Sequence, residues 1–175
     1  MLIRTINTVI LIILLFIAGC SRDDTARYVN KEKGYSIAFP KLWETENGFE
    51  GSDVIAFVPQ EAVVIFRPNI FVGSEELQPG MDEGSYYRLP FKALTGFTSR
   101  IRNFHLIENR TAVLDRVKGK GLVYAYDIGD LKIRVISITV IKDRVGYIIT
   151  GTTVPENYDE FREQYKKVVD SFRFE

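Results

Sequence analysis

Residues 131–154 read LKIRVISITVIKDRVGYIITGTTV, and this stretch decides the fold. It consists of two runs rich in β-branched and aromatic residues on either side of a short polar turn, Lys142 to Arg144. A third run of the same character, GLVYAYDI at residues 121–128, precedes it and is separated from it only by Gly129-Asp130. Connections this short join antiparallel neighbours, so the stretch predicts a three-stranded antiparallel meander.

The middle strand of this meander departs from strict alternation. Val135 and Ile136 are consecutive apolar residues, which leaves two interpretations of the strand. Either a bulge interrupts the strand at this point, or the strand is covered on both of its faces.

The segment after the meander has the period of a helix. In PENYDEFREQYKKVVDSF, residues 155–172, apolar side chains recur every three or four residues. Acidic residues occupy the first turns, Lys166 and Lys167 come late, and Pro155 stands near the start, as the helix dipole and the missing proline N–H favour. The predicted buried face consists of Tyr158, Phe161, Tyr165, Val168, Val169 and Phe172.

Short strands and one helix are predicted before the meander. The strands are GYSIAFP at 34–40, SDVIAFVP at 52–59 and AVVIFRPNIFVG at 62–73. Pro68 predicts that the last of these is an edge strand or is broken by a bulge. A helix is predicted within residues 82–102 from the shared face of Phe91, Leu94, Phe97 and Ile101. Together these elements predict an α+β domain, an antiparallel β-sheet with helices packed on it.

The domain opens with GYSIAFPKLWE, in which Phe39 and Pro40 end a strand and Trp43 follows. Together with GSDVIAFVP and the ending RVISITVIKDRVGYIITGTTVPENYDEFREQYKKVVDSFRF, this opening resembles PsbP-like domains. The resemblance covers most of residues 34–174 and lies mainly in core and turn positions. It implies the Mog1/PsbP-like fold, an α-β-α sandwich, for a domain over residues 34–175. It also implies docking to other proteins, since the family shares no common chemistry.

The first residues of the chain have the features of a secretory signal peptide. Residues 1–19 carry one charged side chain, Arg4, and an apolar run shorter than the ~20 residues of a membrane-spanning helix. The run ends in Ile17-Ala18-Gly19-Cys20, which resembles the lipobox of bacterial lipoproteins. The resemblance implies cleavage before Cys20 and attachment of a diacylglyceryl group to its thiol.

Other roles for a lone cysteine are a buried inert thiol, a reactive nucleophile or an intermolecular disulfide. A nucleophile needs a nearby base, and the one histidine of the chain, His105, is far away in sequence and lies in a polar segment. We therefore expect His105 to be structural and prefer lipidation for Cys20.

The segment after the cysteine is polar and mixed in charge. SRDDTARYVNKEK, residues 21–33, has almost no apolar side chains to bury, which predicts that residues 20–33 form a lipidated N-terminus and a flexible tether. Ser21 favours the periplasmic face of the outer membrane in a cell with two membranes, by resemblance to lipoproteins of such cells.

Composition and motifs argue against nucleic acid binding and catalysis. Basic and acidic residues number 23 each, so no bulk charge attracts nucleic acid. The chain lacks G-x-S-x-G, H-E-x-x-H and a Cys-His pair. Gly119-Lys120-Gly121 is not a phosphate-binding loop, because it lacks the upstream glycine and the following Ser or Thr. Its acidic pairs lack the ligand spacing of a calcium loop. We therefore expect no enzyme activity, no cofactor and no metal site.

The predicted function is that of an accessory domain, held by lipid on the outer face of a bacterial membrane and assisting or stabilising an envelope protein complex. Two alternatives stay open: a photosystem II-associated assembly or stabilising factor, if the source is phototrophic, and a small-ligand carrier. We expect the partner to dock at Tyr86, Tyr87 and Phe71, the last within FRPNIFVG at residues 66–73, where aromatic or apolar residues adjoin loop residues, or on the loop from Ser74 to Gly84.

The predicted anchor has a direct test. Cys20→Ala is expected to move the protein from the membrane fraction to the soluble fraction and to abolish labelling by a fatty-acid analogue, because lipid is the predicted anchor. The native chain, fractionated and labelled in parallel, is the reference. A variant that stays in the membrane fraction would contradict the lipobox prediction.

Overall fold

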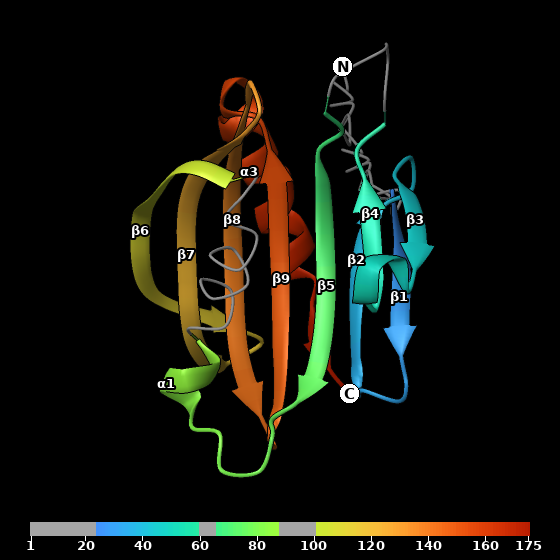
Figure 1. Cartoon of the computed structure of the whole chain (residues 1–175). Helices are drawn as coiled ribbons and strands as arrows, with labels where there is room; N and C mark the ends of the chain where they lie inside the picture. Colours follow the sequence, from blue (N-terminus) through green and yellow to red (C-terminus); the bar gives the residue numbers. More distant parts are fainter. Residues whose placement is uncertain (1–23, 60–65, 88–100) are drawn as a thin grey trace, which may run out of the picture.

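The computed structural model describes residues 24–59, 66–87 and 101–175. Among these residues, two antiparallel sheets and the helix α3 (Tyr158–Asp170) enclose the main core (Figure 1). The larger sheet has the spatial order β3 (Glu44–Asn47), β4 (Val54–Phe57), β5 (Asn69–Glu76), β9 (Val145–Thr153), β8 (Leu131–Lys142), β7 (Val117–Ile128) and β6 (Ile101–Leu114). The smaller sheet has the order β1 (Thr25–Asn30), β2 (Tyr35–Pro40) and β10 (Arg173–Phe174). The short helices are η1 (Phe49–Gly51), α1 (Glu83–Tyr86) and η2 (Pro155–Asn157).

This architecture is the predicted α+β class, with an antiparallel sheet and helices packed on it. The predicted meander is confirmed as β7, β8 and β9, paired in that order. One turn of the meander is shorter than predicted, because Lys142 belongs to β8 and leaves only Asp143 and Arg144, with φ angles of 52° and 63°. Two left-handed residues in succession form the tight turn whose twist matches that of the flanking strands.

β8 is covered on both faces, which decides between the two interpretations of its consecutive apolar residues. Its pairing with both neighbours proceeds without a register shift. Ile136 belongs to the main core, whereas Val135 packs in a second cluster with Leu122 and Tyr124 of β7. The strand therefore contains no bulge at this point. Its middle part is rich in apolar residues because both of its faces are buried from Val135 to Val140.

α3 buries the predicted helix face. Its buried side chains are Tyr158, Phe161, Tyr165, Val168 and Val169, and Phe172 beyond its end is fully buried. The helix approaches β9 closely because Gly151 on that strand has no side chain. A Cβ atom on Gly151 would lie 2.7 Å from the Tyr165 ring and 2.8 Å from the Phe161 ring, which is too close for a real contact.

The prediction of a flexible tether is wrong for residues 25–30. These residues form β1, which pairs with β2 along its whole length. The Arg27 guanidinium donates a hydrogen bond to Ser36 Oγ (3.0 Å), and the Tyr28 hydroxyl donates to the carbonyl of Asp53 (3.3 Å). A segment with little apolar surface is thus held by backbone pairing, which depends on the partner strand rather than on hydrophobicity.

The strands predicted at 34–40 and 52–59 are confirmed as β2 and β4, but the expectation for Pro68 is wrong. β5 begins after this proline and lies between β4 and β9 with continuous registers, so it is neither an edge strand nor bulged. Pro68 precedes the ladder, where its missing N–H costs no strand hydrogen bond, and its carbonyl accepts one from Val58 (2.9 Å). Residues 62–65 of that predicted strand lie outside the described residues.

The helix predicted within 82–102 can be compared with the structure only in part. α1 occupies residues 83–86, whereas Phe91, Leu94 and Phe97 lie outside the described residues. Ile101, expected on that helix face, instead opens β6, a strand of 14 residues that was not expected. β6 is exposed from Arg102 to Thr111, so it shows no alternation of apolar and polar residues that would indicate a strand.

Gly151→Ala is expected to lower the free energy of unfolding by about 1–3 kcal/mol, because the added methyl group has to push α3 away from β9. Urea unfolding measures the change. Thr152→Ala, on the opposite face of β9, is the control and is expected to cost less than ~1 kcal/mol. Where a new methyl group meets no neighbour, replacing glycine by alanine usually stabilises a protein. If Gly151→Ala left the free energy of unfolding unchanged or raised it, the close approach of α3 to β9 would be contradicted.

Candidate functional site

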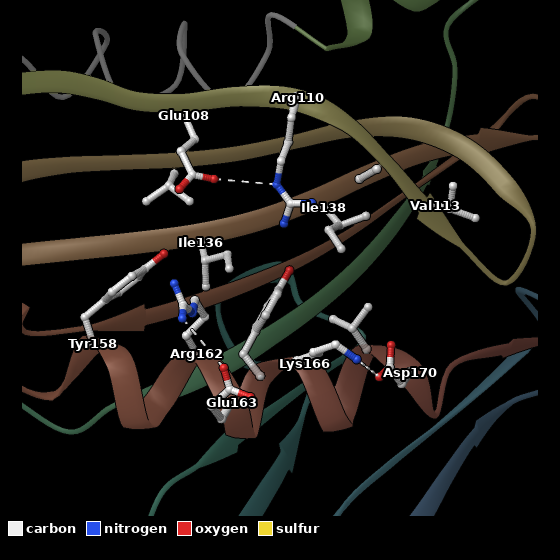
Figure 2. A pocket seen from close by; sticks show the side chains of 14 residues that line it. Glu108, Arg110, Val113, Ile136, Ile138, Tyr158, Arg162, Glu163, Lys166 and Asp170 are labelled. Atoms are coloured by element: carbon white, nitrogen blue, oxygen red, sulfur yellow. Dashed lines mark hydrogen bonds and ion pairs between the residues drawn. The ribbon is translucent and has the colours of Figure 1, made fainter.

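A groove between β6 and α3 is the candidate functional site (Figure 2). It has a volume of about 380 Å³. β7 and β8 supply an apolar floor of Val123, Ile136 and Ile138, and α3 supplies a wall that includes Tyr165 and Val169. A groove of this size and lining suits part of a small molecule or an extended protein segment.

Charged side chains form the rim of the groove, and cations and carboxylates alternate along it. They make three ion pairs: Arg110 Nε with Glu108 Oε2 at 3.6 Å, Arg162 with Glu163 at 3.7 Å, and Lys166 with Asp170. Each of these side chains is 49–67% exposed. Exposed pairs of this kind contribute little to stability, so the charges of a partner can replace them at little cost.

The two tyrosines of the groove do not serve as acids or bases near neutral pH. Burial raises the pKa of Tyr165, whose hydroxyl donates a hydrogen bond to the carbonyl of Ile149 (2.8 Å). Burial also raises the pKa of Tyr158, whose ring centroid lies 4.5 Å from the guanidinium carbon of Arg134. Both hydroxyls therefore stay protonated. The groove offers apolar surface and exchangeable charges, which is the chemistry of binding.

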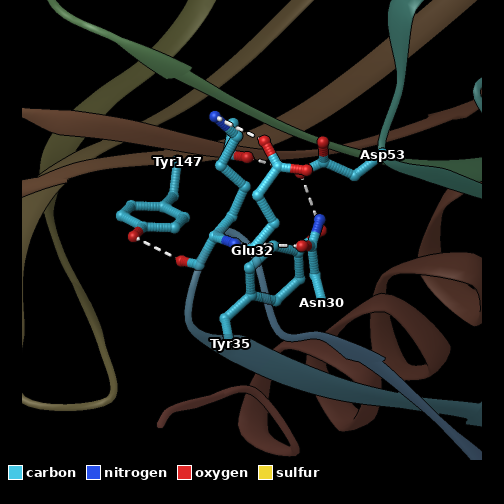
Figure 3. A network of polar contacts seen from close by, with 7 residues as sticks. Asn30, Glu32, Tyr35, Asp53 and Tyr147 are labelled. Carbon is cyan, nitrogen blue, oxygen red and sulfur yellow. Dashed lines mark hydrogen bonds and ion pairs between the residues drawn. The ribbon is translucent and has the colours of Figure 1, made fainter.

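A polar network joins the two sheets at a separate place in the molecule (Figure 3). Asp53, between η1 and β4, accepts hydrogen bonds at Oδ2 from the hydroxyls of Tyr35 (2.8 Å) and Ser74 (2.6 Å). Tyr147 donates to the carbonyl of Lys33 (2.9 Å) in the β1–β2 turn. Since Tyr35 belongs to the smaller sheet and Ser74 to the larger one, the Asp53 carboxylate links the sheets.

Aromatic packing surrounds this network. The Tyr35 ring stacks on the Phe172 ring with centroids 5.2 Å apart and meets the Tyr147 ring edge-on at 5.9 Å. Burial and, second, the charge of Asp53 raise the pKa of Tyr35. A fully buried, neutral phenol that donates to a carboxylate stabilises the junction and is out of reach of a substrate. We therefore assign the network a structural role.

The structure brings together the three residues of the predicted partner surface, since the ring centroids of Tyr86 and Tyr87 lie 6.5 Å apart. Phe71 and Tyr86 line one hollow of about 180 Å³ over β5 and β9. Tyr86 is 5% exposed because its ring fills the space above Gly146, and Phe71 and Tyr87 are half-buried. Tyr86 thus contributes to the fold rather than to an exposed surface, and docking of a partner at this hollow stays a prediction.

Other residues considered from the sequence lie away from the groove. His105 is exposed on β6, with Nδ1 3.0 Å from the carbonyl oxygen of Asn103. The lipobox residues Ile17, Ala18, Gly19 and Cys20 lie outside the described residues, so lipidation stays a prediction. Within the described ranges, no three histidine, cysteine or acidic side chains are grouped to hold a metal ion. No helix in the same ranges is long and apolar enough to cross a membrane.

Sequence reasoning reached the floor of the groove and one of its sides. The α3 side follows from the predicted helix face, whereas the β6 side, with Glu108 and Arg110, was missed together with its strand. The signal that indicates this strand is short: Ala112 and Leu114 are buried and alternate with exposed neighbours.

Comparisons with known proteins identify the fold. No family model and no curated protein matches the chain. Among solved structures, the chain is similar to cyanobacterial PsbP (CyanoP) from Synechocystis sp. PCC 6803, with a TM-score of 0.66 and 17% identity over 90% of this chain and 96% of that one. It is also similar to LpqN, involved in cell envelope biogenesis of Mycobacterium tuberculosis, with a TM-score of 0.61 and 13% identity over 87% of this chain and 86% of that one. These likenesses confirm the PsbP-like fold and, at such low identity, show the fold alone.

Tyr35→Phe is expected to lower the free energy of unfolding by about 1–2 kcal/mol near pH ~8, because a buried hydrogen bond to a carboxylate is lost. Folding raises the pKa of Tyr35, so its contribution is complete below the ordinary value of 10.0 and declines as the pH rises above it. The deficit of the variant relative to the native protein should therefore shrink above that pH. Urea unfolding across this range measures it.

Ser74→Ala is the matched control for this pH dependence. It removes the other hydrogen bond to Asp53 without removing a titrating group, so its deficit should not shrink in the same way. A Tyr35→Phe deficit that stays constant through the alkaline range would contradict the raised pKa.

Proposed function

We propose that this PsbP-like domain is a lipid-anchored binding domain without enzyme activity, held through Cys20 on the outer face of a bacterial membrane. There it assists or stabilises another envelope protein, which binds in the groove between β6 and α3. In a cell with two membranes, the proposed location is the periplasmic face of the outer membrane.

The composition of the groove carries this proposal. Its floor is apolar, whereas its rim consists of exposed ion pairs that hold each other only weakly. A protein segment with both apolar and charged side chains suits this lining, because the apolar side chains reach the floor and the charges meet the rim. Val113, which is 55% exposed, lines the groove from β6 and adds apolar surface to it.

The edge position of β6 supports a protein as the partner. In the described part of the chain, β6 pairs with β7 and has no strand on its other side. Leu106 and Ile107 on this strand are 44% and 38% exposed. An edge strand presents backbone N–H and carbonyl groups that pair with a strand of another protein, while its apolar side chains add contact area.

The comparisons support an envelope setting, since LpqN, which shares the fold, is involved in cell envelope biogenesis. The proposed absence of enzyme activity is supported by the sequence, which contains none of the catalytic motifs considered. It is also supported by the groove tyrosines Tyr158 and Tyr165, which burial keeps protonated.

Two other functions each have one observation in their favour. The likeness to cyanobacterial PsbP favours a photosystem II-associated assembly or stabilising factor if the source is phototrophic. The groove volume of about 380 Å³ lies in the range of small-molecule sites and favours a ligand carrier. The exposed rim and the exposed edge strand favour a protein partner over a small molecule, which is usually enclosed more fully.

Photo-crosslinking tests the proposed partner site. A photoreactive amino acid at Arg162 on α3 or at Val113 on β6 is expected to capture the same envelope protein in cells, because the two positions face one groove. The same amino acid at Glu46, exposed on the edge strand β3, is the control and should not capture that protein. Mass spectrometry of the crosslinked products identifies the partner.

A blocking variant makes this test specific. Val113→Asp, combined with the crosslinker at Arg162, is expected to reduce capture roughly fivefold, which corresponds to about 1 kcal/mol of binding. Val29→Asp changes a similarly exposed valine on β1 and is expected to leave capture unchanged. Failure of the two groove positions to capture a common protein would contradict protein docking, and a small molecule bound to the purified native protein would favour the carrier.

A further inference from the structure

Very little chain separates the proposed anchor from the fold. β1 starts at Thr25, so the five residues from Cys20 span at most about 18 Å when fully extended. The carbonyl of Asp24 accepts a hydrogen bond from the N–H of Lys41 (2.8 Å), which fixes the entering chain beside the β2–β3 loop. A lipid on Cys20 would therefore hold this end of the domain, which we term the anchored end, close to the bilayer.

The anchored end is opposite the end that holds the C-terminus (Figure 1). β1 runs the length of the smaller sheet, from Thr25, paired with Pro40, to Asn30, paired with Tyr35. At the far end, the N–H of Glu175 donates a hydrogen bond to the carbonyl of Gly34 (3.0 Å). The β2–β3 loop thus faces the proposed bilayer, and the β1–β2 turn faces away from it.

The β2–β3 loop exposes an apolar side chain beside a cation. Leu42 is 85% exposed, the highest value among the large apolar side chains of the described residues. Lys41, next to it, is exposed and makes no ion pair with a described residue. Apolar side chains flanked by lysines are typical of protein surfaces that enter the headgroup region of a membrane.

A second groove opens at the anchored end, between the smaller sheet and the side of α3 away from β6. Its volume is about 490 Å³, and Trp43 and Pro40 contribute to its apolar lining. Among the described residues, its charged lining consists of Arg27 from β1 and Lys167 from α3 and includes no carboxylate. We term it the basic groove.

The charges of the basic groove lack ionic partners within the described residues. The Arg27 guanidinium donates hydrogen bonds to Ser36 Oγ (3.0 Å) and to the carbonyl of Ser171 (3.3 Å), which are neutral acceptors. Lys167 makes no ion pair with a described residue. This composition differs from that of the groove beside β6, where three carboxylates balance three cations.

The carboxylate of Glu44 does not cancel the charge of the basic groove. Glu44, at the start of β3, pairs with Arg67 at 2.7 Å. Asp23 and Asp24 precede β1 in the sequence, and Glu160 in the first turn of α3 lies near Val58 and Pro68. Among the described residues, none of these carboxylates lines the basic groove. The basic groove and the β2–β3 loop, with Arg27, Lys167 and Lys41, are thus locally basic in a chain whose charges balance overall.

We infer that the anchored end docks on anionic phospholipid headgroups of the membrane that holds the protein. The phosphate of a headgroup binds between Arg27 and Lys167 in the basic groove, while Leu42 enters the interfacial region and Lys41 contacts the anionic surface. This inference rests on the proposed lipid anchor, which brings the surface to the bilayer, and adds to it a fixed orientation. Docking would direct the β1–β2 turn and the C-terminus away from the membrane.

The native chain contains a fluorescent probe for contact between the basic groove and lipid headgroups. Trp43, the single tryptophan of the sequence, lines the basic groove. Full-length lipidated protein is reconstituted into vesicles of phosphatidylglycerol and phosphatidylcholine, or of phosphatidylcholine alone, each containing a nitroxide-headgroup lipid that quenches tryptophan at short range. Quenching of Trp43 is expected to be roughly twofold stronger in the vesicles that contain the anionic lipid, because cations near an anionic surface strengthen contact.

Charge-reversal variants test which surface is responsible. Lys41→Glu combined with Lys167→Glu is expected to reduce quenching in anionic vesicles to the level in phosphatidylcholine alone. Lys31→Glu combined with Lys118→Glu changes the net charge by the same amount on exposed residues away from the anchored end and is expected to retain the quenching. Circular dichroism of the variants checks that each pair folds.

Flotation of the vesicles and mass spectrometry of Cys20 separate this inference from the proposed anchor. Protein that floats with lipid on Cys20 but shows equal Trp43 quenching in both vesicles, or equal loss in both double variants, would overturn the docked orientation and leave the anchor standing. Protein without lipid on Cys20 that fails to float would overturn the anchor and, with it, the inference.

Discussion

The packing of Phe161 and Tyr165 on the bare backbone of Gly151 holds α3 against β9, and both grooves of the molecule depend on it. Because the helix covers the middle of the larger sheet rather than its edge, space is left on each of its sides. β6 bounds the space on one side, and β1 and β2 bound the space on the other. The position of one helix therefore separates a charge-balanced surface from a basic one.

The sequence predicts those strands and helices whose own residues carry a clear pattern of apolar side chains and turns. β7, β8 and β9 are apolar runs with tight turns, and α3 has a complete apolar face, so local patterns suffice. β1 and β6 have no such pattern, because each is exposed along most of its length. Such strands are held by the backbone of a neighbour, and the neighbour is known only once the topology is known.

The same distinction explains how much of the candidate site could be predicted. Tyr165 and Val169 follow from the helix period, but a buried helix face gives no sign that part of it borders a groove. Arg110 and Glu108 reach that groove because β6, at the edge of the larger sheet, lies across the groove from α3 (Figure 2). Tyr86 illustrates the converse, since adjacent aromatics beside a loop suggest exposure, whereas the gap above Gly146 buries one of them.

The last strand of the chain also determines when the fold can be completed. β10 pairs with β2, and the N–H of Ala38 donates a hydrogen bond to Ser171 Oγ, 133 positions further along the chain. Phe172 and Phe174 pack together beside Tyr35 only after residues 172–174 have been synthesised. Contacts this distant in sequence form late, because a long loop has to close first. For a polypeptide that is exported as proposed, this delay keeps the first strands from closing a stable domain during synthesis, so the chain stays able to thread through a secretion channel.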